Sequence, residues 1–91
     1  MSIVIVGGNE CMTRQYKDLC KEYKSKAKVY PKMTKSMRDM GKPDLLVLFT
    51  NTVSHKMIRS ALEQTKGQDV KVVRSHTSSM NALRGILEEY A

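Results

Sequence analysis

Two short runs of apolar residues constrain the fold of this chain more than any other feature. The runs are IVIV at 3–6 and LLVLF at 45–49, and neither contains a polar residue. Short, uninterrupted apolar runs near glycine or proline are typical of strands that are buried on both faces, as they are in parallel sheets. We therefore expect residues 2–8 and 44–50 to contain the two central strands of such a sheet.

Helical periodicity lies between and after these strands. Apolar side chains recur at the spacing of one buried helix face in four segments. These segments are 9–23, 33–41, 53–67 and 78–91. Two further strands are expected, at 26–30, which is rich in lysine and stopped by Pro31, and at 70–75. The pattern predicts that strand and helix alternate along the whole chain.

Alternating strands and helices predict a parallel sheet with right-handed crossovers. We expect a single domain over residues 1–91, with a small three-layer, Rossmann-like α/β fold and a four-stranded parallel sheet in the order 2-1-3-4. This order places the lysine-rich strand 26–30 at an edge, where charge prevents unwanted pairing. It also places the loops at 7–10 and 50–55 on either side of one crevice, with the loop at 75–79 beside it.

Small and polar residues occupy these three loops. They are Gly7, Gly8, Asn9 and Glu10, then Thr50, Asn51, Thr52, Ser54 and His55, and then Ser75, His76, Thr77, Ser78 and Ser79. Each loop precedes an expected helix, and helix N-termini offer free N–H groups and a partial positive charge that favour an anion or a phosphate. The alternative is that Asn9, Thr52, Ser54 and Ser78 are simply N-caps. Capping explains any one of them, whereas three such loops at one edge favour a ligand site.

Sequence motifs of several enzyme classes are missing. The segment GGNE at 7–10 matches neither the dinucleotide-binding turn nor the phosphate-binding P-loop. There is also no GxSxG elbow and no zinc-ligand spacing. Cys11 lies near a helix start, where a thiolate is stabilised, so a phosphoryl-transfer or redox enzyme is one alternative. We expect instead a non-enzymatic ligand-binding or regulatory module.

The two histidines support another alternative, a haem or metal site. His55 follows Val53 by two residues, so helical geometry turns it about 200° away from the apolar stripe and outward. His76 comes from the neighbouring loop. Together with Cys11 or Met33, the histidines offer ligands suited to haem or a transition metal. Otherwise they are ordinary polar residues of the surface.

The positive charge of the chain is concentrated in one segment. The formal net charge is +7, and residues 21–42 contain eight basic and two acidic residues, so this segment carries six of the seven charges. It favours nucleic acid, an acidic partner or an anionic cofactor, unless it is a solvated edge. Tyr23 and Tyr30 are candidate stacking groups for nucleic acid, although no helix-turn-helix, RRM or KH signature accompanies them.

Length and cysteine content indicate the setting in which the protein works. A chain of 91 residues buries only somewhat more than ~60% of its unfolded surface, so we expect a homodimer to add stability. Cys11 and Cys20 lie on opposite sides of one expected helix and do not pair within it. The sequence shows no signal peptide and no membrane-spanning run, so we expect a cytoplasmic protein.

Three stretches of the sequence resemble a known bacterial family. They are IVIVGG at 3–8, DLLVLFTNTVSHKM at 44–57 and VKVVRSHTSSMNAL at 70–83, and in this order they resemble DUF2325, a bacterial domain of unknown function. The tripeptide VSH at 53–55 is the most distinctive part. The resemblance implies a compact cytoplasmic α/β domain without an established enzymatic activity. Asn51 and Thr52 replace an aspartate and a frequent cysteine of that family, which favours a neutral or anionic ligand over a metal.

Overall fold

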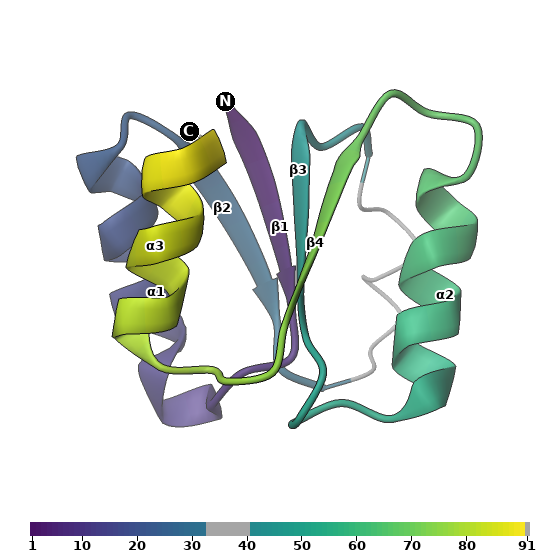
Figure 1. Cartoon of the computed structure of the whole chain (residues 1–91), viewed down its shortest axis with the longest axis horizontal. Coiled ribbons are helices and arrows are strands. Elements are labelled where there is room, and N and C mark those ends of the chain that lie inside the picture. The colour runs from purple at the N-terminus through teal and green to yellow at the C-terminus, as the bar shows by residue number, and fades with distance from the viewer. Residues whose placement is uncertain (33–40, 91) are drawn as a thin grey trace.

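The strands form one parallel sheet. The computed structural model describes residues 1–32 and 41–90. Its strands are β1 (Ser2–Val6), β2 (Lys26–Tyr30), β3 (Leu45–Phe49) and β4 (Lys71–Ser75). They are ordered β2-β1-β3-β4, and all neighbouring strands are parallel (Figure 1). The predicted α/β class and the strand order 2-1-3-4 are confirmed.

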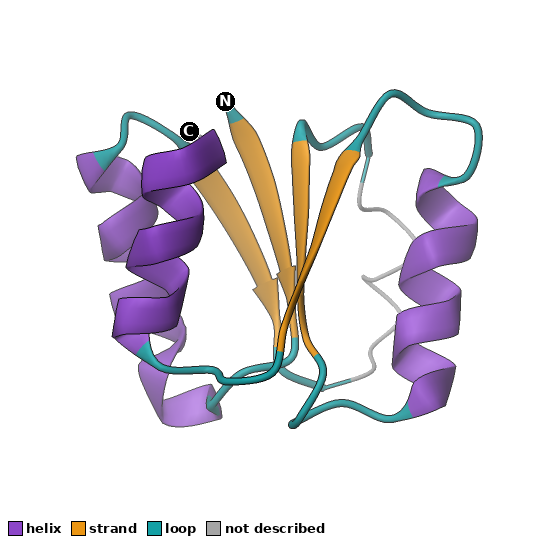
Figure 2. Ribbon diagram, viewed as in Figure 1, coloured by secondary structure: helices purple, strands orange, loops and turns teal. Residues whose placement is uncertain are grey.

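Helices cover both faces of this sheet. A 3-10 turn, η1 (Glu10–Met12), leads into α1 (Thr13–Glu22), while α2 (His55–Thr65) and α3 (Met80–Tyr90) follow β3 and β4. α1 and α3 lie on one face and α2 lies on the other, which gives three layers (Figure 2). The helix predicted within 33–41 falls almost entirely outside the described residues. Among residues 1–32 and 41–90, no helix has the length and apolarity needed to cross a bilayer.

The apolar runs of β1 and β3 supply the centre of the core. Successive side chains of a strand point to opposite faces, so each run contributes to two clusters. Ile3, Ile5, Leu45, Val47 and Phe49 pack toward α1 and α3, and Val4, Val6, Leu46 and Leu48 pack toward α2. All nine side chains are completely buried. Both runs lack polar residues because helices cover the sheet on both sides.

Two of the predicted N-caps are found in the structure, at the starts of η1 and α2. Asn9 Oδ1 accepts a hydrogen bond of 2.9 Å from the backbone N–H of Cys11 at the start of η1. Ser54 Oγ accepts one of 3.3 Å from the N–H of Met57 at the start of α2. Each cap satisfies an N–H group that has no partner inside the helix. Ser54 also explains why α2 begins at His55 rather than at the first residue of the apolar pattern.

The two edges of the sheet differ in character. β2 carries exposed Lys26 and Lys28, so the predicted lysine-rich edge strand is confirmed. β4 forms the other edge and exposes Lys71, Val72 and Arg74. An edge strand that exposes an apolar side chain between two basic ones is less protected against pairing with another chain than one that carries only charge.

Candidate functional site

The loop after β1 packs directly against the loop after β3. The backbone N–H of Gly8 donates a 2.7 Å hydrogen bond to Thr52 Oγ1, which itself donates to the carbonyl oxygen of Phe49 at 3.1 Å. A Cβ on Gly7 would collide with the side chain of Val53. Thr52 and Val53 therefore fill the space beside the two glycines. Thr52 joins the two loops and is not the N-cap of α2.

Tyr16 of α1 joins the loop after β1 to the loop before α3. Its ring is completely buried, and its hydroxyl donates to the carbonyl oxygen of Ser78 at 2.6 Å. The same hydroxyl accepts a 3.2 Å hydrogen bond from the N–H of Asn9. Ser78 is therefore held through its backbone, and the cap of α3 is Ser79, whose Oγ accepts from the N–H of Ala82 at 3.2 Å.

Thr50 joins the loops after β3 and β4. Its N–H and its hydroxyl both donate to the carbonyl oxygen of Ser75, at 2.9 and 3.3 Å. Thr50 Oγ1 also lies 3.3 Å from His76 Nδ1, and Ser75 Oγ donates to the carbonyl oxygen of Thr77 at 2.7 Å. Much of the hydrogen-bonding capacity predicted to serve a ligand is thus used to hold the three loops together.

Most of the predicted site residues are exposed at this edge. Asn51, His55 and His76 are exposed. Glu10 is exposed as well, and its carboxylate forms a 3.1 Å ion pair with Lys32, which lies two residues after the end of β2. The predicted loops therefore meet at one edge, and many of their residues remain exposed there although several also hold the loops together.

The structure does not assemble the predicted metal ligands. Within residues 1–32 and 41–90, no three His, Cys, Asp or Glu side chains come close enough together to hold a metal ion. His55, His76 and Cys11 thus form no such group, and Met33 lies outside the described residues. Cys11 is exposed, whereas burial raises the pKa of the Cys20 thiol to about 11. Cys20 therefore stays protonated near neutral pH.

The two tyrosines predicted to stack on nucleic acid both have structural contacts. Tyr30 is only 9% exposed and belongs to the core cluster beneath α2. The hydroxyl of Tyr23 lies 3.3 Å from Glu88 Oε1 and donates to it, which links α1 to α3. Tyr30 is therefore placed for packing rather than for stacking on a base.

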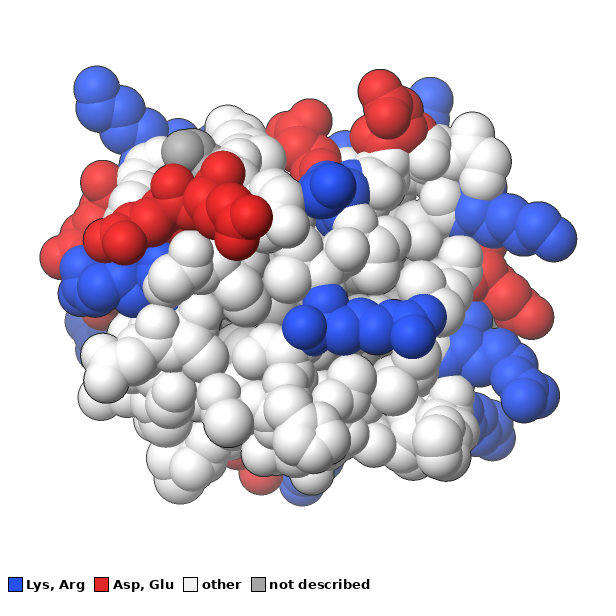
Figure 3. Space-filling model, viewed as in Figure 1, with Lys and Arg blue, Asp and Glu red and all other residues white. Residues whose placement is uncertain are grey.

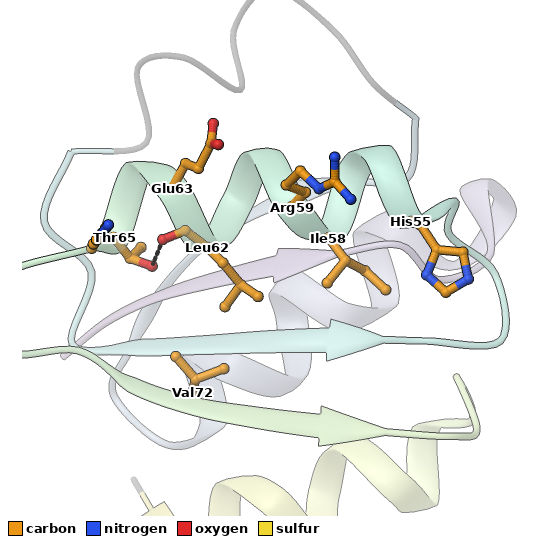
Figure 4. A pocket seen from close by; sticks show the side chains of 8 residues that line it. His55, Ile58, Arg59, Leu62, Glu63, Thr65 and Val72 are labelled. Carbon is orange, nitrogen blue, oxygen red and sulfur yellow. Dashed lines mark hydrogen bonds between the residues drawn. The ribbon is translucent and has the colours of Figure 1, made fainter.

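A groove of about 600 Å³ runs between α2 and β4 (Figure 4). It is lined by His55, Ile58, Arg59, Leu62, Glu63, Thr65, Lys66 and Val72. The side chains of Ile58 and Leu62 project from α2 toward the sheet, and Val72 projects from β4 toward α2 (Figure 4). His55 lies at the end of the groove next to the predicted site. This histidine therefore belongs both to the predicted edge and to the groove.

The position of α2 over the sheet creates the groove. Met57 and Ala61 are buried against the central strands, so α2 sits over the middle of the sheet. Ile58 and Leu62 each follow one residue later, which turns them about 100° around the helix toward β4. They are only partly buried, and Val72 beneath them is 37% exposed. The helix thus leaves an apolar trough above the edge strand.

Sequence reasoning missed this groove. The apolar pattern of the helix was assigned as a whole to the core, although it occupies two adjacent rows, 57/61 and 58/62. An apolar stripe of this width is ordinary for a helix that covers a sheet. The sequence therefore contains no signal that the row 58/62 would remain partly exposed.

The rim of the groove is mainly basic. Arg59 and Lys66 line it on α2, and Arg74 is exposed on the groove side of β4, whereas Lys71 lies on the other face of the strand over the ring of Tyr90. Glu63 is the acidic residue in the lining. Figure 3 shows basic side chains gathered over α2 and crossing the β4 side, while acidic side chains gather over the end of α3. An anionic group is therefore favoured at the rim of the groove.

Comparison with known proteins shows the family of the chain. Searches of curated proteins and of solved structures gave no significant match. A family model of uncharacterised proteins conserved in bacteria, DUF2325, matches residues 2–90. This match includes both of the loops that Thr52 joins and the whole groove between α2 and β4. The chain belongs to the DUF2325 family.

Proposed function

We propose that this chain is a binding module without catalytic activity, and that its groove between α2 and β4 holds a ligand with an anionic group and an apolar body. The observation that carries the proposal is the groove itself, with Ile58, Leu62 and Val72 on its walls and Arg59 at its rim. Its volume of about 600 Å³ lies in the range of ligand sites, and such sites combine apolar walls with a few polar groups.

The end of the groove at His55 favours the anionic group of the ligand. His55 is the first residue of α2, where the N-terminal end of the helix carries a partial positive charge. Arg59 lies one turn further along the same helix and adds a full charge. An apolar body attached to the anion would then lie over Ile58, Leu62 and Val72. This arrangement supports an amphipathic ligand rather than a small inorganic anion.

The contacts of Thr50 and His76 support binding rather than catalysis. These residues form the pair that comes nearest to a hydroxyl nucleophile and its base, with Oγ1 and Nδ1 3.3 Å apart. The hydroxyl of Thr50, however, donates to the carbonyl oxygen of Ser75. A nucleophile needs its proton directed to the base, and the base needs a third group that orients it. The pair is therefore suited to hold two loops together.

A fluorescent anion can test the proposed function. The probe is 8-anilinonaphthalene-1-sulfonate, which combines an aromatic body with a sulfonate, and its fluorescence is titrated against the full chain. Arg59→Gln should weaken binding about threefold, because an exposed ion pair contributes less than about 1 kcal/mol. Arg14→Gln is the matched control, since Arg14 is exposed on α1 and lies across the sheet from the groove. Equal affinities of the two variants would contradict the proposal.

Substitution of His55 tests the same end of the groove at a second residue. His55 is exposed, so His55→Ala should change the free energy of unfolding by less than about 1 kcal/mol. It should nevertheless weaken binding of the anilinonaphthalene probe several-fold. His76→Ala is the control, because His76 is also exposed but does not line the groove. A large loss of stability with unchanged binding would make His55 a structural residue.

A further inference from the structure

We propose that the natural ligand of the groove is an extended acidic peptide segment of another protein, which pairs with β4 as a fifth strand of the sheet. This inference rests on the proposed function, because the peptide would place its side chains in the same groove. It adds a partner class and a binding mode. Three features carry it: the free backbone groups of β4, the direction of its side chains and the charge around it.

The backbone of β4 has hydrogen-bonding groups directed away from the sheet. The N–H of Lys71 donates to Asp44 at 3.1 Å, and the carbonyl of Ser75 accepts from Thr50 at 2.9 Å, so both residues direct their backbone toward β3. Backbone direction alternates along a strand. Val72 and Arg74 therefore direct their N–H and C=O groups outward. In the described part of the chain, no strand pairs with this side of β4.

The side chains of β4 would place alternate residues of an added strand in the groove. Val72 and Arg74 are paired with Leu46 and Leu48, which belong to the cluster beneath α2. Val72 and Arg74 consequently face the groove side of the sheet. An added strand would also point every second side chain to this side, next to Ile58 and Leu62. This is how strand addition gains affinity from the backbone and specificity from side-chain pockets.

The charge around β4 favours an acidic partner over a second copy of this chain. Arg59, Lys66 and Arg74 are the basic residues on the groove side, with Glu63 among them, and Lys71 lies on the other face of β4. Two copies would bring these basic groups together, and each copy carries a net charge of +7. Carboxylates opposite basic side chains stabilise strand pairs, whereas like charges destabilise them. Nucleic acid would satisfy the charge, but it would leave the apolar walls without a partner.

Amide exchange can test strand addition residue by residue. The probe is an acetylated and amidated peptide of about six residues, which matches the usual length of a strand. Valine and glutamate follow one another in pairs, so that each face of the added strand carries both kinds of side chain. The full chain is labelled with nitrogen-15, and exchange is measured with and without the peptide. At about 90% saturation, the amides of Val72 and Arg74 should exchange about tenfold more slowly. The amide of Val73 is an internal control, because it is directed toward β3 and should not change.

Two control peptides separate backbone pairing from charge attraction. N-methylation of alternate residues keeps the carboxylates but removes backbone donors, and this peptide should not slow exchange at Val72 and Arg74. A peptide with lysine in place of each glutamate should not bind. If protection arises with the N-methylated peptide, or is absent with the parent peptide, strand addition is overturned. Protection that rises with protein concentration alone would assign β4 to a second copy instead.

The same samples distinguish the failure of this inference from the failure of the proposed function. Binding of the anilinonaphthalene probe with loss in Arg59→Gln, but no effect of the peptide, would leave the groove as a small-molecule site and overturn only the peptide partner. Binding of neither probe would overturn both. A single-stranded oligonucleotide that binds where the peptide does not would overturn the choice of partner class.

Discussion

Gly8 shows how a single residue determines the geometry of the loop edge. Its φ angle is +91°, in the left-handed region that favours glycine, and a Cβ there would lie 2.8 Å from the ring of Tyr16. The two glycines after β1 are therefore required by the fold, since a Cβ on Gly7 would lie still closer to the side chain of Val53. Both glycines belong to one of the three loops that the sequence predicts to hold an anion or a phosphate. Their contacts show that protein side chains occupy the space around them.

The contribution of close packing at Gly8 can be separated from that of its backbone angle. Gly67 has a similar φ of +81°, but no atom lies within 4 Å of the position of its Cβ. Gly67→Ala should lower the free energy of unfolding by about 1 kcal/mol, because the backbone angle is unfavourable for alanine. Gly8→Ala adds the collision with Tyr16 and should lower the free energy of unfolding by about 3 kcal/mol or more. Urea unfolding measures the stability of both variants. Equal losses of stability would show that the ring of Tyr16 moves away from the new methyl group at no cost in free energy.

The two cysteines should differ in reactivity and in their effect on stability. Cys11 is exposed, so a thiol reagent should modify one cysteine in the native chain and two after denaturation. Burial raises the pKa of Cys20 from 9.0 to about 11. Between these values the unfolded thiol ionises and the native one does not, so stability is lost as pH rises from 9 to 11.

The pH dependence of Cys20 can be isolated by substitution. The pKa shift of Cys20 corresponds to a loss of roughly 2–3 kcal/mol in the free energy of unfolding across this pH range. Cys20→Ala should be less stable than the unsubstituted chain near neutral pH because a buried side chain is shortened. Its stability should, however, fall less steeply between pH 9 and 11. Parallel pH profiles of the two proteins, measured by urea unfolding, would contradict a buried, protonated thiol.

At the scale of elements, local patterns predicted the strands but not the groove. The four strands and the apolar stripes of α1, α2 and α3 follow from periodicity, which depends on residues close together in the sequence. The groove depends on how far α2 is displaced sideways from β4. That displacement is set by packing between distant segments, and a single-helix pattern does not contain it. The contacts of Thr52 and Tyr16 were not predictable for the same reason.

Among the contacts between elements, the hydrogen bonds of the Tyr16 hydroxyl have the clearest expected effect on stability. This buried hydroxyl connects the start of η1 with the residue before the cap of α3. Tyr16→Phe would leave a carbonyl and an N–H without this partner and should destabilise by about 1–3 kcal/mol. Tyr23→Phe on the same helix is the control, because its hydroxyl bond is longer and exposed, and it should change stability by less than about 0.5 kcal/mol. Thermal unfolding of both variants makes the comparison.

At the scale of the whole molecule, strand order explains why the predicted loops meet. The chain forms β2 on one side of β1 and then crosses to form β3 on the other side. The loops after β1 and β3 therefore lie next to each other, and this was predictable from the strand order alone. The side chains of Thr52 and Val53 occupy the space beside Gly7, which strand order alone does not reveal. Strand order also places two unequal edges on the sheet, because β2 exposes lysines and β4 exposes Val72 as well as basic residues.

The net charge of +7 should make the stability of the molecule depend on salt. The two ion pairs described for residues 1–32 and 41–90, Lys32 with Glu10 and Arg84 with Glu22, are both largely exposed and contribute little. Repulsion among the remaining basic groups should then dominate, and salt screens it. We expect the melting temperature to rise by roughly 3–6 °C between 10 and 300 mM sodium chloride.

A charge-reduced variant tests whether repulsion causes this salt effect. Lys17→Glu combined with Lys28→Glu lowers the net charge from +7 to +3, because each replacement removes two charges, and both residues are exposed. The melting temperature of the variant at 10 mM salt should be higher than that of the unsubstituted chain, and it should rise less as salt is added. If both proteins respond to salt equally, screening of net charge is not the cause. The salt response would then reflect specific binding of chloride, which sodium fluoride at the same ionic strength would not reproduce.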